Sequence, residues 1–240
     1  MTIKTAISYF AIKAISYGFQ PPRSKRVAAL DQLAKTIALL KQLEINVFLD
    51  VGANRGYYAK HIRDAGYKGH IFSFEPIKSD CEHIERLSSG DEKWKVLNYA
   101  LGAENGTKQF NMVQLGGHTV LSSFLAIKDG IQGSIFPVDL RRLDDVLPSL
   151  IRAIEKPRVF LKMDTQGYDS HVVKGATECL NLILGLQSEV SVIPLYDGMR
   201  SYTQSLSDYH NLGFGLVDLF VVNRTKEDLV LEYDCLMRRS

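Results

Sequence analysis

The chain has 240 residues, of which 45% are hydrophobic, enough for one well-buried core. Its formal net charge is only +2, and its lysines and arginines are interspersed with acids, which argues against a nucleic-acid-binding protein. The three cysteines are far apart and form no CxxC pair, so a disulfide framework or a zinc knuckle is not indicated. We therefore expect a cytoplasmic protein with a small-molecule partner.

The first residues, MTIKTAISYFAIKAISYGF, are apolar but lack the features of a signal peptide. Lys13 interrupts them, and no small-residue cleavage site follows. No stretch of the sequence reaches the ~18 apolar residues that span a bilayer. Ile3, Ile7, Phe10 and Ala14 recur at helical spacing and predict an amphipathic helix. Packing of this helix on the domain is favoured over contact with a membrane surface, and both interpretations stay open.

A second helix is predicted over VAALDQLAKTIALLKQL, ending near Glu44, because apolar residues repeat there every three and four positions. Strand-like and helix-like segments alternate after it. The predicted strands are Asn46–Val51, His70–Phe74, Lys95–Tyr99, Arg158–Met163, Ile183–Val190, Leu216–Val222 and Leu229–Leu236. The predicted helices are Arg55–Ala65, Ser79–Leu87, Leu143–Ala153, Tyr168–Cys179 and Tyr202–Leu212. This alternation is typical of an α/β fold in which helices cover both faces of a parallel sheet.

Two regions depart from the alternation. Residues 102–139 are rich in glycine and serine and predict an insert of short strands and loops. The end of the chain predicts a hairpin, whose two strands are antiparallel. We expect an N-terminal helical segment over residues 1–43 and one domain over residues 44–240, with a mostly parallel sheet that ends in this hairpin.

The stretch VFLDVGANRGYYAKHIRDAGYKGHIFSFEP joins two strands through a glycine turn and a helix, and it finishes on an acid. Gly52 follows the first strand directly, and Gly56 stands four positions later. This spacing predicts a tight turn that leaves the first amides of the helix open to a ligand. The GxGxxG motif of dinucleotide enzymes is absent, and two glycines alone also occur in ordinary loops.

The acids beside the turn distinguish between ligands. Asp50 precedes it, and its carboxylate would repel a pyrophosphate but attract an ammonium or sulfonium group. Glu75 follows at the ~20-residue separation at which an acid meets ribose hydroxyls, and Pro76 fixes the chain beyond it. Ala100 and Leu101, after the third strand, suit an adenine. Either acid alone is more often a helix cap or a surface group, but together they favour S-adenosylmethionine over a nicotinamide dinucleotide, whose oxidoreductase chemistry is the alternative.

These motifs resemble the FkbM-type methyltransferases, a branch of the seven-stranded, Rossmann-like fold that uses S-adenosylmethionine. The resemblance runs from about Glu44 to Arg238. The similar blocks are DVGANRGYYAKHIRDAGYKGHIFSFEP, NYALG, SSF, FLKMDTQGYDSHVVKGA, SEVSVIPLYDGM and EYDCLMR. No NPPY-like block follows the fourth strand, unlike in enzymes that methylate amino groups of nucleic-acid bases.

The resemblance implies a role for several residues. Gly52, Ala53 and Asn54 would lie against the methionine part of the cofactor, Glu75 would hold the ribose, and Ala100 would lie near the adenine. It also implies an O-methyltransferase that acts on a hydroxyl of a sugar, glycan or glycosylated natural product. A module that binds the donor without catalysis is the second alternative. Gln166 stands where many members of the family carry glutamate.

Three side chains are candidates for the base that removes the acceptor proton, a contribution of ~10²–10⁴-fold to the rate. Asp164, at the end of the fourth strand, is the first candidate, and the alternative is that it caps the helix expected to begin near Gly167. Glu189, at the end of the fifth strand, either faces the acceptor or is satisfied internally. His118 lies in the glycine-rich insert, where an ordinary histidine pKa of ~6.5 suits proton removal, although loop histidines are more often merely solvated.

Tyr196 and Asp197 follow the fifth strand and are expected to line the acceptor cavity, although packing explains Tyr196 equally well. No cluster of histidines and acids has the spacing of a metal site, so we expect a reaction without a metal ion.

Overall fold

The computed structural model describes residues 25–113, 122–128 and 133–239. The predicted amphipathic helix at the N-terminus and His118 lie outside these ranges. The helices and strands are α2 (Lys25–Gln42), β1 (Val47–Val51), α3 (Tyr57–Asp64), β2 (His70–Phe74), α4 (Lys78–Leu87), β3 (Trp94–Leu97), β4 (Ala100–Leu101), β5 (Gly106–Met112), β6 (Ser134–Arg141), α5 (Leu143–Leu150), β7 (Val159–Met163), α6 (Asp169–Lys174), η1 (Leu180–Leu182), β8 (Ile183–Ser191), α7 (Tyr202–Asn211), β9 (Phe214–Arg224) and β10 (Val230–Arg239).

The main sheet has seven strands in the order β3-β2-β1-β7-β8-β10-β9, which confirms the predicted fold class. Its first five strands are mutually parallel, whereas β10 pairs antiparallel with both β8 and β9. Every residue of β1 and β7 is buried, because both strands lie in the middle of the sheet and are covered on both faces. This explains why their sequences, VFLDV and VFLKM, are almost continuously apolar.

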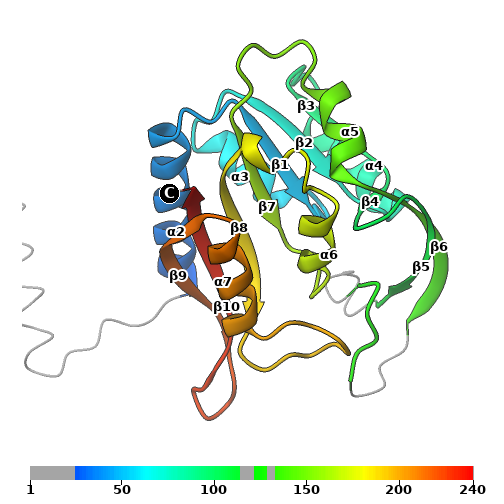
Figure 1. Ribbon diagram of the computed structural model, residues 1–240, viewed down its shortest axis with the longest axis vertical. Coiled ribbons are helices and arrows are strands. Elements are labelled where there is room, and N and C mark those ends of the chain that lie inside the picture. Colours follow the sequence, from blue (N-terminus) through cyan, green and yellow to red (C-terminus); the bar gives the residue numbers. More distant parts are fainter. Residues whose placement is uncertain (1–24, 114–121, 129–132, 240) are drawn as a thin grey trace, which may run out of the picture.

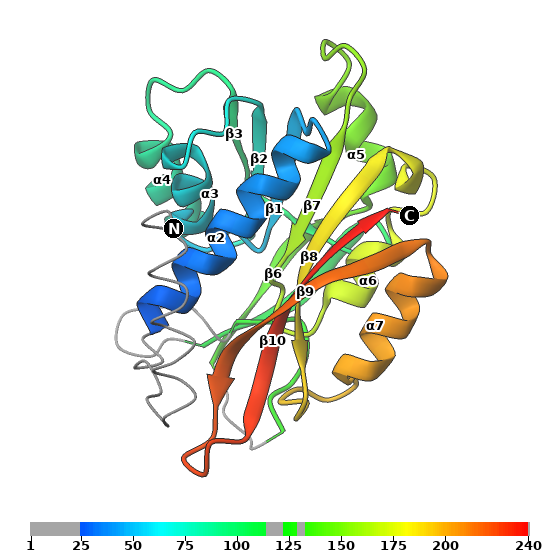
Figure 2. The same ribbon diagram turned by 90° about the vertical axis from the view of Figure 1, so that its left-hand side faces the viewer.

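Helices cover the two faces of the main sheet (Figures 1 and 2). On one face, Phe48 and Phe160 stack with their ring centroids 5.4 Å apart and belong to the same core as residues of α2, α3 and α4. On the other face, Leu49 and Leu161 belong to a core with residues of α5, α6 and α7. The alternation of side chains along β1 and β7 therefore decides which layer each residue contacts.

The insert forms a second sheet of three strands in the order β4-β6-β5, beside α6 (Figure 1). Its core includes Phe110, Leu140 and Tyr168. The predicted short strands are longer than expected, since β5 has seven residues and β6 has eight. Ala100 and Leu101 do not extend the third strand but form β4 of this small sheet.

The sixth helix is shorter than predicted, ending at Lys174 rather than Cys179. Gly175 follows it and packs on the backbone of Gly102, where a Cβ would overlap the carbonyl oxygen of Gly102. This close approach fixes the end of α6 against the start of the insert. Within the described ranges, no helix is both long and apolar enough to span a membrane.

Candidate functional site

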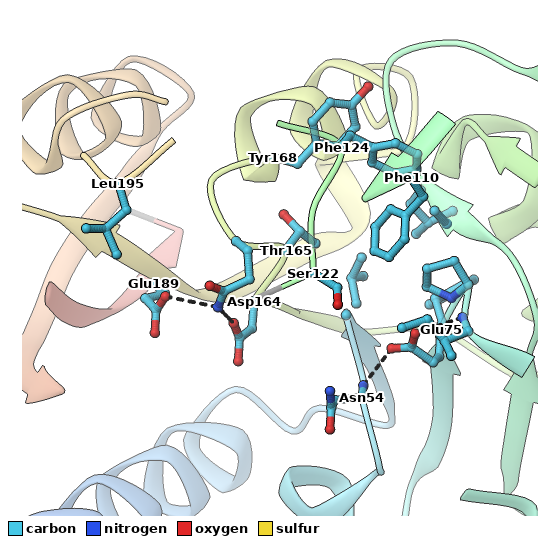
Figure 3. Close-up of a pocket in the computed structure, with 18 of the residues that line it drawn as sticks. Asn54, Glu75, Phe110, Ser122, Phe124, Asp164, Thr165, Tyr168, Glu189 and Leu195 are labelled. Atoms are coloured by element: carbon cyan, nitrogen blue, oxygen red, sulfur yellow. Dashed lines mark hydrogen bonds between the residues drawn. The ribbon is translucent and has the colours of Figure 1, made fainter. Parts of the chain in front are cut away.

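A cavity of about 490 Å³ lies at the carboxyl ends of β1, β2, β7 and β8, beside the small sheet. Ligands of open α/β sheets bind at this edge, and the volume falls within the ~300–1,000 Å³ of ordinary small-molecule sites. Eight of the predicted cofactor-binding and catalytic residues line the cavity: Gly52, Asn54, Glu75, Pro76, Ala100, Leu101, Asp164 and Glu189. Figure 3 shows Glu75 near Phe110 at one end and Asp164 near Glu189 at the other.

Glu75 directly follows β2 and is held by the backbone on both sides. Its Oε2 accepts a hydrogen bond from the amide of Asn54 at 2.7 Å, and its Oε1 accepts one from the amide of Ile77 at 2.9 Å. Burial raises its pKa to about 8, although the two amide donors oppose that effect. A fixed carboxylate with remaining lone pairs toward the cavity suits a vicinal diol such as a ribose.

The turn over residues 52–56, called the donor turn below, differs in detail from the prediction. The amides of Gly52 and Ala53 both donate to the carbonyl of Phe74, and the amide of Asn54 donates to Glu75. These N–H groups are therefore engaged with β2 and its acid rather than open to a ligand. The turn serves to hold Glu75 and to bring backbone close to the cavity, with Gly52 at φ 73° and Asn54 at φ 48°.

The turn over residues 164–168, called the acid turn below, follows β7. The side-chain amide of Gln166 donates to Asp164 Oδ1 at 3.0 Å and to Glu189 Oε1 at 3.4 Å (Figure 3). The hydroxyl of Tyr196 donates in turn to Gln166 Oε1 at 3.0 Å. Gln166 thus fixes two carboxyl groups at one end of the cavity. The alternative helix-capping role of Asp164 is not observed, because α6 begins at Asp169 and has no side-chain cap.

The two carboxyl groups of this end differ in environment. Burial, followed by the nearby charges of Asp164 and Glu232, raises the pKa of Glu189 well above its ordinary value. The side chain of Asp164 is 41% exposed and lies 3.8 Å from the ammonium group of Lys162. Asp164 is therefore a partly exposed carboxyl group at this end of the cavity, whereas Glu189 lies among other acids.

Asp50 does not line the cavity, in contrast to the expectation from the sequence. It lies within β1 on the side that faces α3, is completely buried, and forms an ion pair with Lys162 at 3.0 Å. Its charge is therefore balanced inside the protein and is not presented to a ligand. Lys162, the charged residue within the apolar strand VFLKM, was the feature of the sequence that could have indicated this partner of Asp50.

The remaining predicted residues are placed as follows. Ala53 is buried in the core beneath α3, and Gly56 is the N-cap of that helix, packed against Ile84. Neither lines the cavity. Neither Tyr196, which bonds the cavity residue Gln166, nor the exposed Asp197 lines the cavity. In the described part of the chain, no group of three histidine, cysteine or acidic side chains is arranged to hold a metal ion.

Several cavity residues were not predicted from the sequence. The insert contributes Phe110, Ser122 and Phe124, and the rings of Phe110 and Phe124 lie 5.0 Å apart. The C-terminal hairpin contributes Asn223, Arg224, Leu231 and Glu232. The blocks SSF and EYDCLMR pointed to some of these residues, but nothing local in the sequence indicates that two distant segments meet the same cavity.

A family model described as "Methyltransferase FkbM domain" matches residues 50–203, which is well over half of the chain. The sequence has no significant match among curated proteins. One similar solved structure is the FkbM methyltransferase of Methylobacillus flagellatus KT, with a TM-score of 0.48 and 16% identity. That comparison covers 81% of this chain and 43% of the other, so the matched part of this chain spans less than half the length of the Methylobacillus protein.

Two further solved structures have comparable scores. The magnesium protoporphyrin IX methyltransferase ChlM of Synechocystis PCC 6803, with bound SAM, has a TM-score of 0.48 and 11% identity, covering 100% of this chain and 98% of that one. An rRNA methylase of Streptococcus thermophilus has a TM-score of 0.46 and 9% identity, covering 85% and 94% of the two chains.

Proposed function

This chain belongs to the family of FkbM methyltransferase domains, and on that basis we propose that it is an O-methyltransferase that uses S-adenosylmethionine. The acceptor is a hydroxyl group of a sugar, glycan or glycosylated natural product. One observation supports the proposal beyond family membership: a single cavity at the carboxyl edge of the sheet has a fixed carboxylate at one end and a carboxyl pair at the other.

Glu75 would hold the ribose of the donor, and residues of the small sheet would contact its adenine. Glu75 would accept hydrogen bonds from the two ribose hydroxyls, while the amides of Asn54 and Ile77 hold its carboxyl group in place. Ala100, Leu101 and the ring of Phe110 provide an apolar wall for the base. When bound, the donor supplies a methyl group on a positively charged sulfur.

The acid turn receives the acceptor. Methyl transfer is an in-line displacement, so the acceptor oxygen has to be aligned and water excluded. Asp164 accepts the hydroxyl proton, because its side chain is 41% exposed and Gln166 holds it at this end of the cavity. Burial and the neighbouring acids raise the pKa of Glu189, which favours its protonated form, and in that form it can donate a hydrogen bond to a second oxygen of the acceptor. Leu195 and Leu231 provide apolar contacts at this end.

Calorimetry with S-adenosylhomocysteine tests the proposal. We expect the parent protein to bind it and Glu75→Gln to lose at least about tenfold in affinity, since a carboxamide has only one oxygen to accept hydroxyl protons. Glu82→Gln, on the exposed side of α4, is the matched control and should bind as the parent does. The proposal is wrong if the folded parent shows no binding, or if NADH binds in preference.

A second experiment tests the reaction. Labelled S-adenosylmethionine is incubated with the protein and a panel of glycosides and glycosylated natural products, and methylated products are identified by their gain in mass. Transfer to an oxygen supports the proposal, whereas transfer only to nitrogen contradicts the assignment as an O-methyltransferase.

A further inference from the structure

A buried cation lies directly beneath the proposed site. Lys162, on β7, is only 4% exposed, and its Nζ lies 3.0 Å from Asp50 Oδ1. In the register of the sheet it stands between Asp50 on β1 and Gln187 on β8, and Asp50 stands next to Ser73 on β2. These four side chains, here called the polar row, are all buried.

The polar row places charged groups in a layer that apolar side chains could also fill. Taking an ion pair out of water costs several kcal/mol per ion, and apolar side chains of similar size often serve as well or better. Two positions before Asp50 and Lys162 on the same strands, Phe48 and Phe160 show such apolar packing on the same face of the sheet. The ion pair is therefore better explained by what Lys162 contacts than by stability alone.

Lys162 contacts both turns of the site. Its Nζ lies 3.4 Å from the carbonyl oxygen of Gly52 in the donor turn and 3.8 Å from Asp164 Oδ2 in the acid turn. The turns also touch each other, because a Cβ at Gly52 would overlap the carbonyl oxygen of Asp164. Among the described residues, Lys162 is the only cation that forms an ion pair with Asp164.

We propose that Lys162 is a positioning residue that joins the two turns, so that binding of the methyl donor at the donor turn orders Asp164 on the acid turn. This inference rests on the proposed function, since it requires a donor at the first turn. The role is mainly geometric, because Asp50 already balances the charge of Lys162. Tyr58 closes the layer with its ring 5.3 Å from the ammonium group and its hydroxyl bonded to Gln187, so Lys162 is held in place.

Because the residues of the polar row are buried and paired, an informative variant has to change both partners of the ion pair. Replacing Lys162 alone leaves Asp50 charged and buried without its partner, which is strongly destabilising. The double variant Asp50→Asn/Lys162→Met removes both charges and the link between the turns together. If it does not fold by circular dichroism, Asp50→Asn/Lys162→Gln is used, because its shorter side chain can bond Asn at position 50 but cannot reach both turns.

Hydrogen exchange measured by mass spectrometry, with and without S-adenosylhomocysteine, reports the coupling and needs no acceptor. In the parent, we expect the ligand to slow exchange in both the donor turn and the acid turn. In the double variant, protection of the donor turn should persist, while protection of the acid turn falls by about tenfold, a typical coupling between two sites. A residue that only stabilised the fold would change exchange with and without ligand alike.

The control removes the charges of a different ion pair, which is only partly buried. Arg63 and Asp91 lie 2.7 Å apart and do not line the cavity. Arg63→Met/Asp91→Asn should leave the protection by ligand at both turns as in the parent. If the Lys162 double variant does the same, the inference is overturned and the proposed function stands. If the parent binds no S-adenosylhomocysteine, the proposed function itself fails.

Discussion

The carboxyl group of Glu75 has a pKa of about 8, raised by burial, and the proposed ribose contact requires it to be ionised. Binding must therefore release a proton whenever the pH lies below this value. We predict that affinity for 5′-methylthioadenosine, which carries the ribose but no amino-acid group, rises about tenfold per pH unit up to about pH 8 and then levels off. Calorimetry across this range measures the slope.

The slope of affinity against pH distinguishes Glu75 from an exposed acid. A carboxylate with an ordinary pKa of ~4.3 would already be ionised at neutral pH and would give a flat profile. The variant Glu75→Gln should bind weakly and without any slope. An affinity of the parent that stays constant between about pH 6 and about pH 8 would contradict the assignment of Glu75.

Asp164 is predicted to act in the chemical step rather than in donor binding. Asp164→Asn keeps the size of the side chain and can still contact Gln166, but it no longer accepts a proton. We expect turnover to fall by ~10²–10⁴-fold while the affinity for S-adenosylhomocysteine changes little. If turnover is unchanged, Glu189 or His118 becomes the better candidate for the base. Asp145→Asn, on the exposed side of α5, serves as the control.

From the sequence alone, the roles of Asp50 and Glu75 could not be distinguished. Both are acids at the end of an apolar strand. Asp50 is still inside β1 and faces the helices, where Lys162 balances it, whereas Glu75 lies one residue beyond β2 and faces the cavity. A shift of one residue decides the face of a strand, and strand ends are not defined that precisely by a pattern of residues.

The donor turn is where two elements approach most closely, and Gly52 makes that approach possible. It has φ 73°, and a Cβ there would overlap the carbonyl oxygen of Asp164. Gly52→Ala combines this overlap with the strain of a left-handed conformation, so we predict a loss of about 3 kcal/mol or more in the free energy of unfolding. Urea denaturation measures it, and donor binding should be lost as well.

The control for Gly52→Ala separates the two contributions. Gly66 has φ 98° and no atom within 4 Å of the position of a Cβ, so Gly66→Ala carries strain without overlap. We expect it to cost ~1–2 kcal/mol and to leave donor binding unchanged. Equal losses in the two variants would mean that contact between the donor turn and the acid turn contributes nothing.

Elements of the main sheet were predictable because their patterns are local. The second strand was predicted at its observed bounds, His70–Phe74, and the hairpin was predicted as antiparallel. The three-stranded sheet was not predicted as a unit. Its strands β5 and β6 pair although the segment between Met112 and Ser134 separates them in the sequence. Strand β4, which precedes β5 in the sequence, pairs with the other side of β6. Such pairing depends on tertiary contacts, which no local pattern reports.

The segment Ser122–Lys128, here called the strap, connects the insert to the turns and loops that surround the cavity. Ser123 pairs with Asn111 of β5, and its Oγ donates to the carbonyl oxygen of Gln166 at 2.9 Å. Further along, the amide of Lys128 donates to the carbonyl oxygen of Leu195 at 3.0 Å. The strap thus joins the small sheet, the acid turn and the loop after β8, and Ser122 and Phe124 within it line the cavity.

In the described residues, the hydroxyl of Ser123 forms the one side-chain hydrogen bond between the strap and the acid turn. Its removal therefore tests whether the strap closes the cavity. Ser123→Ala leaves the carbonyl of Gln166 without this donor and the amide of Leu125 without its acceptor. The loss of the bond to Gln166 is ~1 kcal/mol, which corresponds to about fivefold more frequent opening. We predict exchange of the Lys128 and Asp197 amides to accelerate by that factor, and S-adenosylhomocysteine to dissociate faster. The control is Ser149→Ala, which removes a similar bond to Val146 on α5, away from the cavity. If both variants release the ligand at the parent's rate, the strap does not retain it, and access to the cavity is set by other segments.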